Sequence, residues 1–121
     1  MVSNDTIILA VNYLASSAEI QKALADMRTA IDSGKFQPIN RTKNKDTLAA
    51  LGLTWKDAKE EIYGLSERHY RRGPMEDRDD PETDFFWEFK KNVDGNVIYI
   101  KFKVMYQEDG RVKVVSFHLD E

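Results

Sequence analysis

The last third of the chain carries acid–base and cationic side chains at alternate positions in three short stretches. They are Glu88 and Lys90, then Tyr99, Lys101 and Lys103, then Ser116 and His118. A carboxylate, an imidazole, a phenol and ammonium groups, if gathered on one surface, suit RNA cleavage without a metal ion. One group would remove the proton of the ribose 2′-hydroxyl, another would protonate the leaving 5′-oxygen, and cations would stabilise the developing phosphorane charge.

Three expected strands decide whether these side chains meet. Residues 85–93, 96–106 and the last stretch before residue 119 alternate apolar with polar residues, a pattern typical of strands with one buried face. Asp94-Gly95 predicts a two-residue hairpin turn, and Glu108-Asp109-Gly110 marks a second turn. We therefore expect an antiparallel three-stranded β-meander over residues 85–119.

The two turns also predict the register of the meander. If Val93 pairs with Asn96 and Tyr106 with Arg111, the polar pairs are Glu88–Lys101, Lys90–Tyr99, Tyr99–His118 and Lys101–Ser116. The same register gives an apolar face with the pairs Phe89–Ile100, Trp87–Phe102, Ile100–Phe117 and Phe102–Val115, and leaves Val114 on the polar side. Directly opposed side chains lie about 5 Å apart, so the polar residues should form one cluster.

Within this cluster, Glu88 and His118 are the expected base and acid, because carboxyl and imidazole groups exchange protons more readily near neutral pH than lysine or tyrosine does. Lys101, opposite Glu88, should keep that carboxylate ionised. Lys101 and Arg72 are also expected to stabilise the phosphate charge. The residues expected to bind RNA are Arg71, Lys90, Lys103 and Ser116. The alternative is an ordinary solvated sheet face, on which such charged pairs are common.

The first half of the chain predicts helices. Ser16 followed by Glu19 has the spacing of a capping box, and the apolar residues Ile20, Leu24, Met27 and Ile31 then form one stripe that ends before Gly34. Asn44 is expected to cap a short helix that ends at Gly52, and Thr54 with Asp57 should begin a third helix with Trp55 on its core side. A strand is also expected over residues 36–39. The apolar residues 5–14 predict a short helix, with a strand as the alternative.

These elements predict one α+β domain over residues 1–121, with N-terminal helices packed on the C-terminal meander. Its parts are an N-terminal extension (1–17), a helical part (18–65), a long polar loop (66–84) and the meander (85–119). Residues 35–72 carry nine cations and five acids, whereas residues 73–84 carry one cation and six acids. That acidic stretch lacks the glycine and the ligand spacing of a calcium loop, so we expect a solvated loop.

Composition excludes several classes of site. The chain has no cysteine and only two histidines, so we expect no thiolate or histidine-rich metal site and no cofactor. No apolar run approaches the roughly 18 residues that a membrane span needs. The apolar stretch near the N-terminus has no Lys or Arg ahead of it, unlike a signal peptide. These features predict a cytoplasmic protein without a membrane anchor.

Five segments resemble the MqsR toxins, the ribonuclease halves of bacterial toxin–antitoxin pairs. They are Ala50-Leu51-Gly52-Leu53, Ile62-Tyr63-Gly64-Leu65-Ser66-Glu67, Trp87, Gly95-Asn96-Val97-Ile98-Tyr99-Ile100-Lys101 and Val115-Ser116-Phe117-His118. The resemblance extends from about Ala18 to His118. It implies a RelE/ParE-like fold, a single-stranded RNA substrate and a cognate antitoxin protein.

The resemblance also implies a catalytic set. The family's lysine, glutamine, tyrosine and second lysine fall at Arg72, Glu88, Tyr99 and His118 of this sequence. Only Tyr99 is unchanged. Arginine keeps the cation, histidine keeps a group that can donate a proton, and glutamate replaces a neutral amide with a carboxylate that can accept one. A competing hypothesis is a non-catalytic RelE-like module whose polar face and acidic loop bind a protein.

Overall fold

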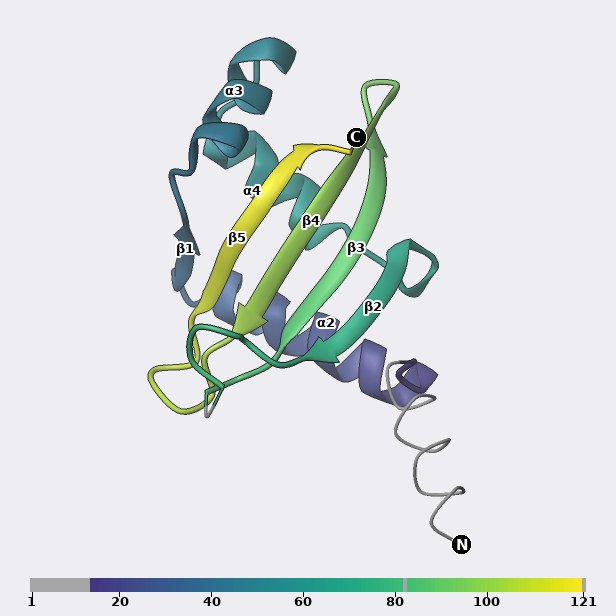
Figure 1. Ribbon diagram of the computed structural model, residues 1–121, viewed down its shortest axis with the longest axis vertical. Helices are drawn as coiled ribbons and strands as arrows, with labels where there is room; N and C mark the ends of the chain where they lie inside the picture. The colour runs from purple at the N-terminus through teal and green to yellow at the C-terminus, as the bar shows by residue number, and fades with distance from the viewer. Residues whose placement is uncertain (1–13, 82, 121) are drawn as a thin grey trace, which may run out of the picture.

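The computed structural model describes residues 14–81 and 83–120 and arranges them as helices on a five-stranded sheet (Figure 1). The helices are α2 (Ser17–Asp32), α3 (Thr42–Leu51) and α4 (Trp55–Tyr63), followed by the 3-10 turn η1 (Glu67–His69). The strands are β1 (Phe36–Pro38), β2 (Tyr70–Met75), β3 (Phe86–Val93), β4 (Asn96–Val104) and β5 (Val112–Leu119), in the spatial order β1-β5-β4-β3-β2. Strand β1 is parallel to β5 and the other neighbours are antiparallel, which confirms the α+β class. The helix expected within residues 5–14 lies almost entirely outside the described residues.

Helix α2 begins and packs as its sequence predicts. The Ser16 hydroxyl accepts a hydrogen bond from the Glu19 N–H (3.2 Å), and the Glu19 carboxylate accepts one from the Ser16 N–H (2.9 Å). Ile20, Leu24 and Met27 are buried. The helix therefore covers the core face of the sheet, behind the strands in Figure 1.

Helix α3 begins earlier than expected, with Arg41 and not Asn44 at its N-cap position. Asn44 is fully buried, and its amide binds the backbone of neighbouring segments. Its Nδ2 donates to the carbonyls of Ile39 (2.9 Å) and Val115 (3.0 Å), and its Oδ1 accepts from the Phe117 N–H (3.0 Å). The predicted cap is therefore wrong, because the side chain satisfies strand β5 instead.

The two other helix boundaries hold. Gly52 ends α3 in the left-handed conformation, as expected. Thr54 and Asp57 form the expected capping box of α4. The ring of Trp55 packs edge-on against Phe36 and Phe117, with centroids 6.5 and 6.4 Å apart, which confirms its place on the core side.

The expected loop over residues 66–84 is wrong in its first half, because Tyr70–Met75 form the edge strand β2. The pairing of β2 with β3 shifts register twice, so the residues of β2 do not follow the apolar–polar alternation of a regular strand. Pro74, which has no N–H to donate, is tolerated at an edge. Gly73 has a φ of +131°, and a Cβ there would lie 2.9 Å from the Phe86 carbonyl oxygen. The close approach of β2 to β3 therefore requires glycine.

The register of the meander is confirmed in its site-forming half. Asp94 and Gly95 have positive φ values of 53° and 83°, as the predicted hairpin turn requires. The observed pairs include Glu88–Lys101, Lys90–Tyr99, Tyr99–His118 and Lys101–Ser116. All four expected polar pairs are therefore present.

The second hairpin differs near its turn. Phe102 pairs with Val114 instead of Val115, because a bulge inserts Val115 into β5. Near the turn, the Met105 N–H donates to the Arg111 carbonyl (2.8 Å), so the expected pairing of Tyr106 with Arg111 is wrong. Val114 is consequently buried in the core and not on the polar side. The turn lies one residue away from its expected position, and the bulge shifts the pairing of β4 with β5 by one residue in the opposite sense. The two shifts cancel, so the pairs beyond the bulge are those expected.

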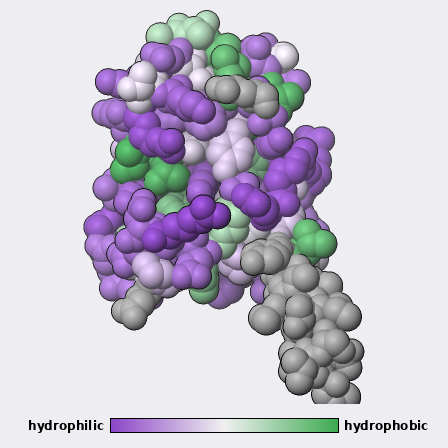
Figure 2. Space-filling view, viewed as in Figure 1, coloured by the Kyte–Doolittle hydropathy of each residue, from purple (hydrophilic) through white to green (hydrophobic). Residues whose placement is uncertain are grey.

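The core lies between the sheet and the helices, and the other face of the sheet is exposed. Figure 2 looks onto that exposed face and shows mostly hydrophilic side chains over the strands. No helix within the described residues is long and apolar enough to cross a lipid bilayer.

Candidate active site

Four strands present two rows of polar side chains on the exposed face of the sheet. The first row is Arg72, Glu88, Lys101 and Ser116, and the second is Lys90, Tyr99 and His118. We call these seven residues the polar face. Each row crosses the strands through directly paired positions, so residues far apart in the sequence become neighbours.

The Glu88 carboxylate lies at the centre of the polar face. Its Oε2 accepts a hydrogen bond from Arg72 Nη2 at 3.1 Å, and the same carboxylate acts on the Tyr99 hydroxyl, whose pKa it raises. Glu88 is only 7% exposed. The cation that neutralises Glu88 is therefore Arg72, which corrects the expectation that Lys101 does so. The Lys101 ammonium lies over the Phe86 ring, 4.6 Å from its centroid, in a cation–π contact.

The Tyr99 hydroxyl is held in its neutral form. Burial is the largest cause that raises the pKa of Tyr99 above its ordinary value of 10.0, followed by the hydrogen bond to Glu88 and the charge of that carboxylate. The charges of Arg72 and Arg41 oppose this effect and are smaller. Tyr99 is therefore protonated at neutral pH, and its O–H can donate a hydrogen bond to Glu88 while its oxygen accepts another.

His118 lies next to Tyr99 on strand β5. The two rings are 5.2 Å apart between centroids and inclined by 36°. His118 Nδ1 lies 3.0 Å from the Leu119 carbonyl oxygen. Since a carbonyl only accepts hydrogen bonds, Nδ1 must carry a proton, and Nε2 is the nitrogen that can exchange one.

A groove of about 990 Å³ opens beside Arg72 and Lys101. Met75, Phe86 and Pro81 give it apolar walls. Arg78 adds a third cation to its lining, and Glu76 and Asp79 place two acids at its acidic-loop side. Phosphate oxygens and a flat base need cationic and apolar surface respectively. The groove has both and lies next to Glu88.

Arg41 also belongs to this surface, and sequence reasoning missed it. Its Nη1 donates to the Ser116 hydroxyl (3.2 Å) and to the Val115 carbonyl (3.1 Å). Ser116 itself is 2% exposed, so it positions Arg41 more readily than it contacts RNA. The contact depends on the path from β1 to α3, which no spacing in the sequence reveals.

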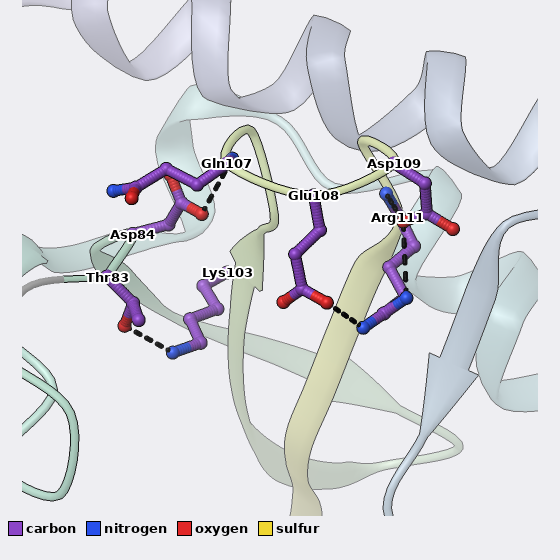
Figure 3. A network of polar contacts seen from close by, with 7 residues as sticks. All are labelled: Thr83, Asp84, Lys103, Gln107, Glu108, Asp109 and Arg111. Atoms are coloured by element: carbon purple, nitrogen blue, oxygen red, sulfur yellow. Dashed lines mark hydrogen bonds and ion pairs between the residues drawn. The ribbon is translucent and has the colours of Figure 1, made fainter.

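Lys103 is not accessible, which corrects its expected role in RNA binding. Its ammonium donates to Asp77 Oδ2 (2.8 Å) and Thr83 Oγ1 (3.1 Å), and the residue is 2% exposed. Figure 3 shows Lys103 directed at Thr83, next to Asp84, whose carboxylate accepts from the Gln107 N–H (3.3 Å). Lys103 thus holds Asp77 and Thr83, in the acidic stretch that follows β2, against the end of the sheet.

Within residues 14–81 and 83–120, no three His, Asp, Glu or Cys side chains are grouped so that they could hold a metal ion. Two carboxylates of this region are instead paired with cations, the buried Glu88 with Arg72 and the half-buried Asp77 with Lys103. The surroundings of Tyr99 therefore offer hydrogen bonds and positive charge.

A family model described as "Motility quorum-sensing regulator, toxin of MqsA" matches residues 20–119. The chain belongs to the MqsR toxin family. This confirms the resemblance noted in the sequence. The match extends from α2 to the end of β5, so the polar face of this MqsR-family toxin lies within the region that defines the family. A search among curated proteins finds no match.

Proposed function

We propose that this toxin is a metal-independent endoribonuclease, an mRNA interferase that cleaves single-stranded RNA on its polar face. The observation that carries the proposal is the linked set Arg72–Glu88–Tyr99, with the His118 ring beside Tyr99. It combines a cation, a proton acceptor and a second proton-exchanging group within one surface. The expected place of action is the cytoplasm.

The proposed proton transfers use the neighbours of Tyr99 on the polar face. The 2′-hydroxyl donates to the Tyr99 oxygen, and Tyr99 passes its own proton to Glu88 as the 2′-oxygen attacks phosphorus. His118 Nε2 protonates the 5′-oxygen as the bond from phosphorus to that oxygen breaks. The products are a 2′,3′-cyclic phosphate and a 5′-hydroxyl. This route accounts for a tyrosine that is held neutral and yet lies between two groups that exchange protons.

Cations stabilise the transition state. Arg72 presents a planar guanidinium that suits two phosphate oxygens. Lys101 borders the same groove, and Arg41 approaches from the opposite end of the first row. Groups already held in place lose little energy in reorganising as charge develops.

We also infer a cognate protein antitoxin, because the matching family is described as the toxin of MqsA. The test is co-expression with the product of the adjacent gene. The toxin should arrest growth alone and co-purify with its neutraliser. A neighbour that neither relieves arrest nor co-purifies would count against the pairing.

The enzymatic proposal is tested by incubating the purified protein with a long single-stranded RNA in EDTA. Cleavage is expected, and His118→Ala purified in parallel should lack it, which controls for contaminating nucleases. Growth arrest without cleavage by the intact protein would instead favour a protein-binding module.

A further inference from the structure

A second hollow, of about 370 Å³, adjoins the polar face at Lys90. We call its main lining the basic groove, formed by Arg68, His69, Arg71, Lys90 and Lys91. Asn92 and Val97 complete the lining, so it contains four cations and no acid. A groove of one charge sign attracts ions of the opposite sign.

Lys90 joins the basic groove to the polar face. It pairs directly with Tyr99, and it lies two residues beyond Glu88 on β3, about 7 Å along the strand. The other walls come from η1, the first half of β2 and the β3–β4 hairpin. A strand bound at Tyr99 and leaving along β3 would therefore enter the basic groove.

Local contacts hold two of the cations in place. Lys90 pairs with Asp120 (3.0 Å), and Lys91 pairs with Glu61 (3.0 Å) on α4. Arg68 and Arg71 are exposed, and Arg71 Nη1 donates to the Tyr70 carbonyl at 2.9 Å. The lysines are thus partly neutralised at the rim, while the two arginines carry most of the groove's exposed charge.

His69 reports the resulting positive field. Its Nδ1 accepts from the Ser66 N–H at 3.0 Å, so its Nε2 carries the proton of the neutral ring. Burial is the largest cause that lowers the pKa of His69, followed by the charges of Arg68, Lys91 and Arg71. Three cations of the groove therefore act on one titratable ring.

We propose that the basic groove binds the phosphate backbone of the RNA beyond the cleaved nucleotide, so that the toxin favours substrates that extend past the scissile phosphate. The inference rests on the proposed ribonuclease function and assigns it a second subsite. The ligand is the backbone, not a particular base, since the lining offers charge and few groups that read base edges. If the polar face alone bound the RNA, a substrate that extends past the scissile phosphate would be cleaved no better than a short one.

The kinetic test compares a long RNA with a short one that just spans the scissile phosphate. Arg68→Gln/Arg71→Gln should lower the preference for the long RNA about tenfold, with KM affected more than kcat. Loss of two phosphate contacts should also reduce the salt dependence of long-RNA binding by about 1.4 in the log–log slope. The matched control is Lys56→Gln/Lys59→Gln. It removes the same number of charges from α4, outside the lining of the basic groove. An unchanged preference in the arginine variant would overturn the inference.

The chain's two histidines allow a second measurement, since His69 lies in the basic groove and His118 on the polar face. NMR spectra of both rings are followed with uncleavable 2′-O-methyl oligonucleotides. The long oligonucleotide should perturb both rings and raise the pKa of His69, because phosphates offset the three cations; the short one should perturb His118 alone. If the long oligonucleotide perturbs only His118, the groove does not bind RNA, although the proposed function survives. If intact toxin cleaves no RNA and neither ring responds, the proposed function itself fails.

Discussion

Arg72 and Glu88 pair at 3.1 Å across strands β2 and β3, and the carboxylate is nearly enclosed. The pair brings an edge strand into the site and holds the carboxylate that the proposed mechanism assigns as the acceptor of the Tyr99 proton. An enclosed carboxylate that already has a cation and a phenol as partners can take a proton from Tyr99 without moving. This geometry makes Glu88 the first residue to test.

Glu88→Gln should lower the cleavage rate by about 10²–10⁴, because an amide cannot accept the Tyr99 proton. Single-turnover cleavage of RNA measures the effect, and circular dichroism checks the fold. Glu60→Gln, at an exposed position of α4, is the matched control. Full activity in Glu88→Gln would show that Glu88 only positions Arg72 and Tyr99, in agreement with the glutamine that the family resemblance assigns there.

His118→Ala should also cost about 10²–10⁴ in rate, because the leaving oxygen loses its proton donor. His118→Lys should recover part of the loss, since an ammonium group can donate a proton from the same strand position. The shape of the pH–rate profile should change in His118→Ala and His118→Lys. Equal activity of His118→Ala and the unaltered protein would remove His118 from the mechanism.

The hairpin at Asp94-Gly95 explains how much of the site could be predicted. A two-residue turn fixes the register of β3 on β4, and the alternation of apolar residues then assigns faces. The second hairpin was less predictable, because the bulge at Val115 shows in the sequence only as two adjacent apolar residues, Val114 and Val115, which break the alternation without giving its cause. The polar pairs were nevertheless predicted correctly. The assumed turn was wrong by one residue, and the bulge shifts the strands back by one residue before the polar pairs are reached.

Long-range contacts explain what could not be predicted. Arg41 reaches the site through the β1–α3 connection, and Lys103 is enclosed by the acidic loop. Strand β2 is an edge strand with glycine, proline and two register shifts, so its sequence resembles a loop. Local periodicity carries no information about any of these three features.

Asn44→Ala should destabilise the fold by about 3 kcal/mol, because it leaves the Phe117 N–H and two carbonyls without their buried partner. Chemical denaturation measures the change in the free energy of unfolding. Lys45→Ala, at the next and exposed position of α3, should stay within about 0.5 kcal/mol. Comparable stability of Asn44→Ala and Lys45→Ala would contradict the role assigned to the Asn44 amide.

Asp77→Ala should cost about 3 kcal/mol at neutral pH, because it leaves the enclosed Lys103 ammonium without its anion. The hydrogen bond from Lys103 is the largest cause that lowers the pKa of Asp77 below its ordinary 3.8. A lowered folded-state pKa stabilises the fold above pH 3.8 and ceases to do so as pH falls through the folded value. The stability difference between Asp77→Ala and the unaltered protein should therefore shrink below that pH. Asp80→Ala in the same loop is the control, and a difference that does not change with pH would contradict the pairing.

The most direct test of the central claim replaces the 2′-hydroxyl. A long RNA with its cleavage sites mapped in EDTA is compared with the same RNA carrying one 2′-deoxynucleotide on the 5′ side of a mapped scissile phosphate. Cleavage should stop at that site alone, and products from the other sites should carry 2′,3′-cyclic phosphate and 5′-hydroxyl ends. Continued cleavage at the deoxy site, 5′-phosphate products, or cleavage that only Mg²⁺ restores would contradict 2′-hydroxyl attack by the polar face.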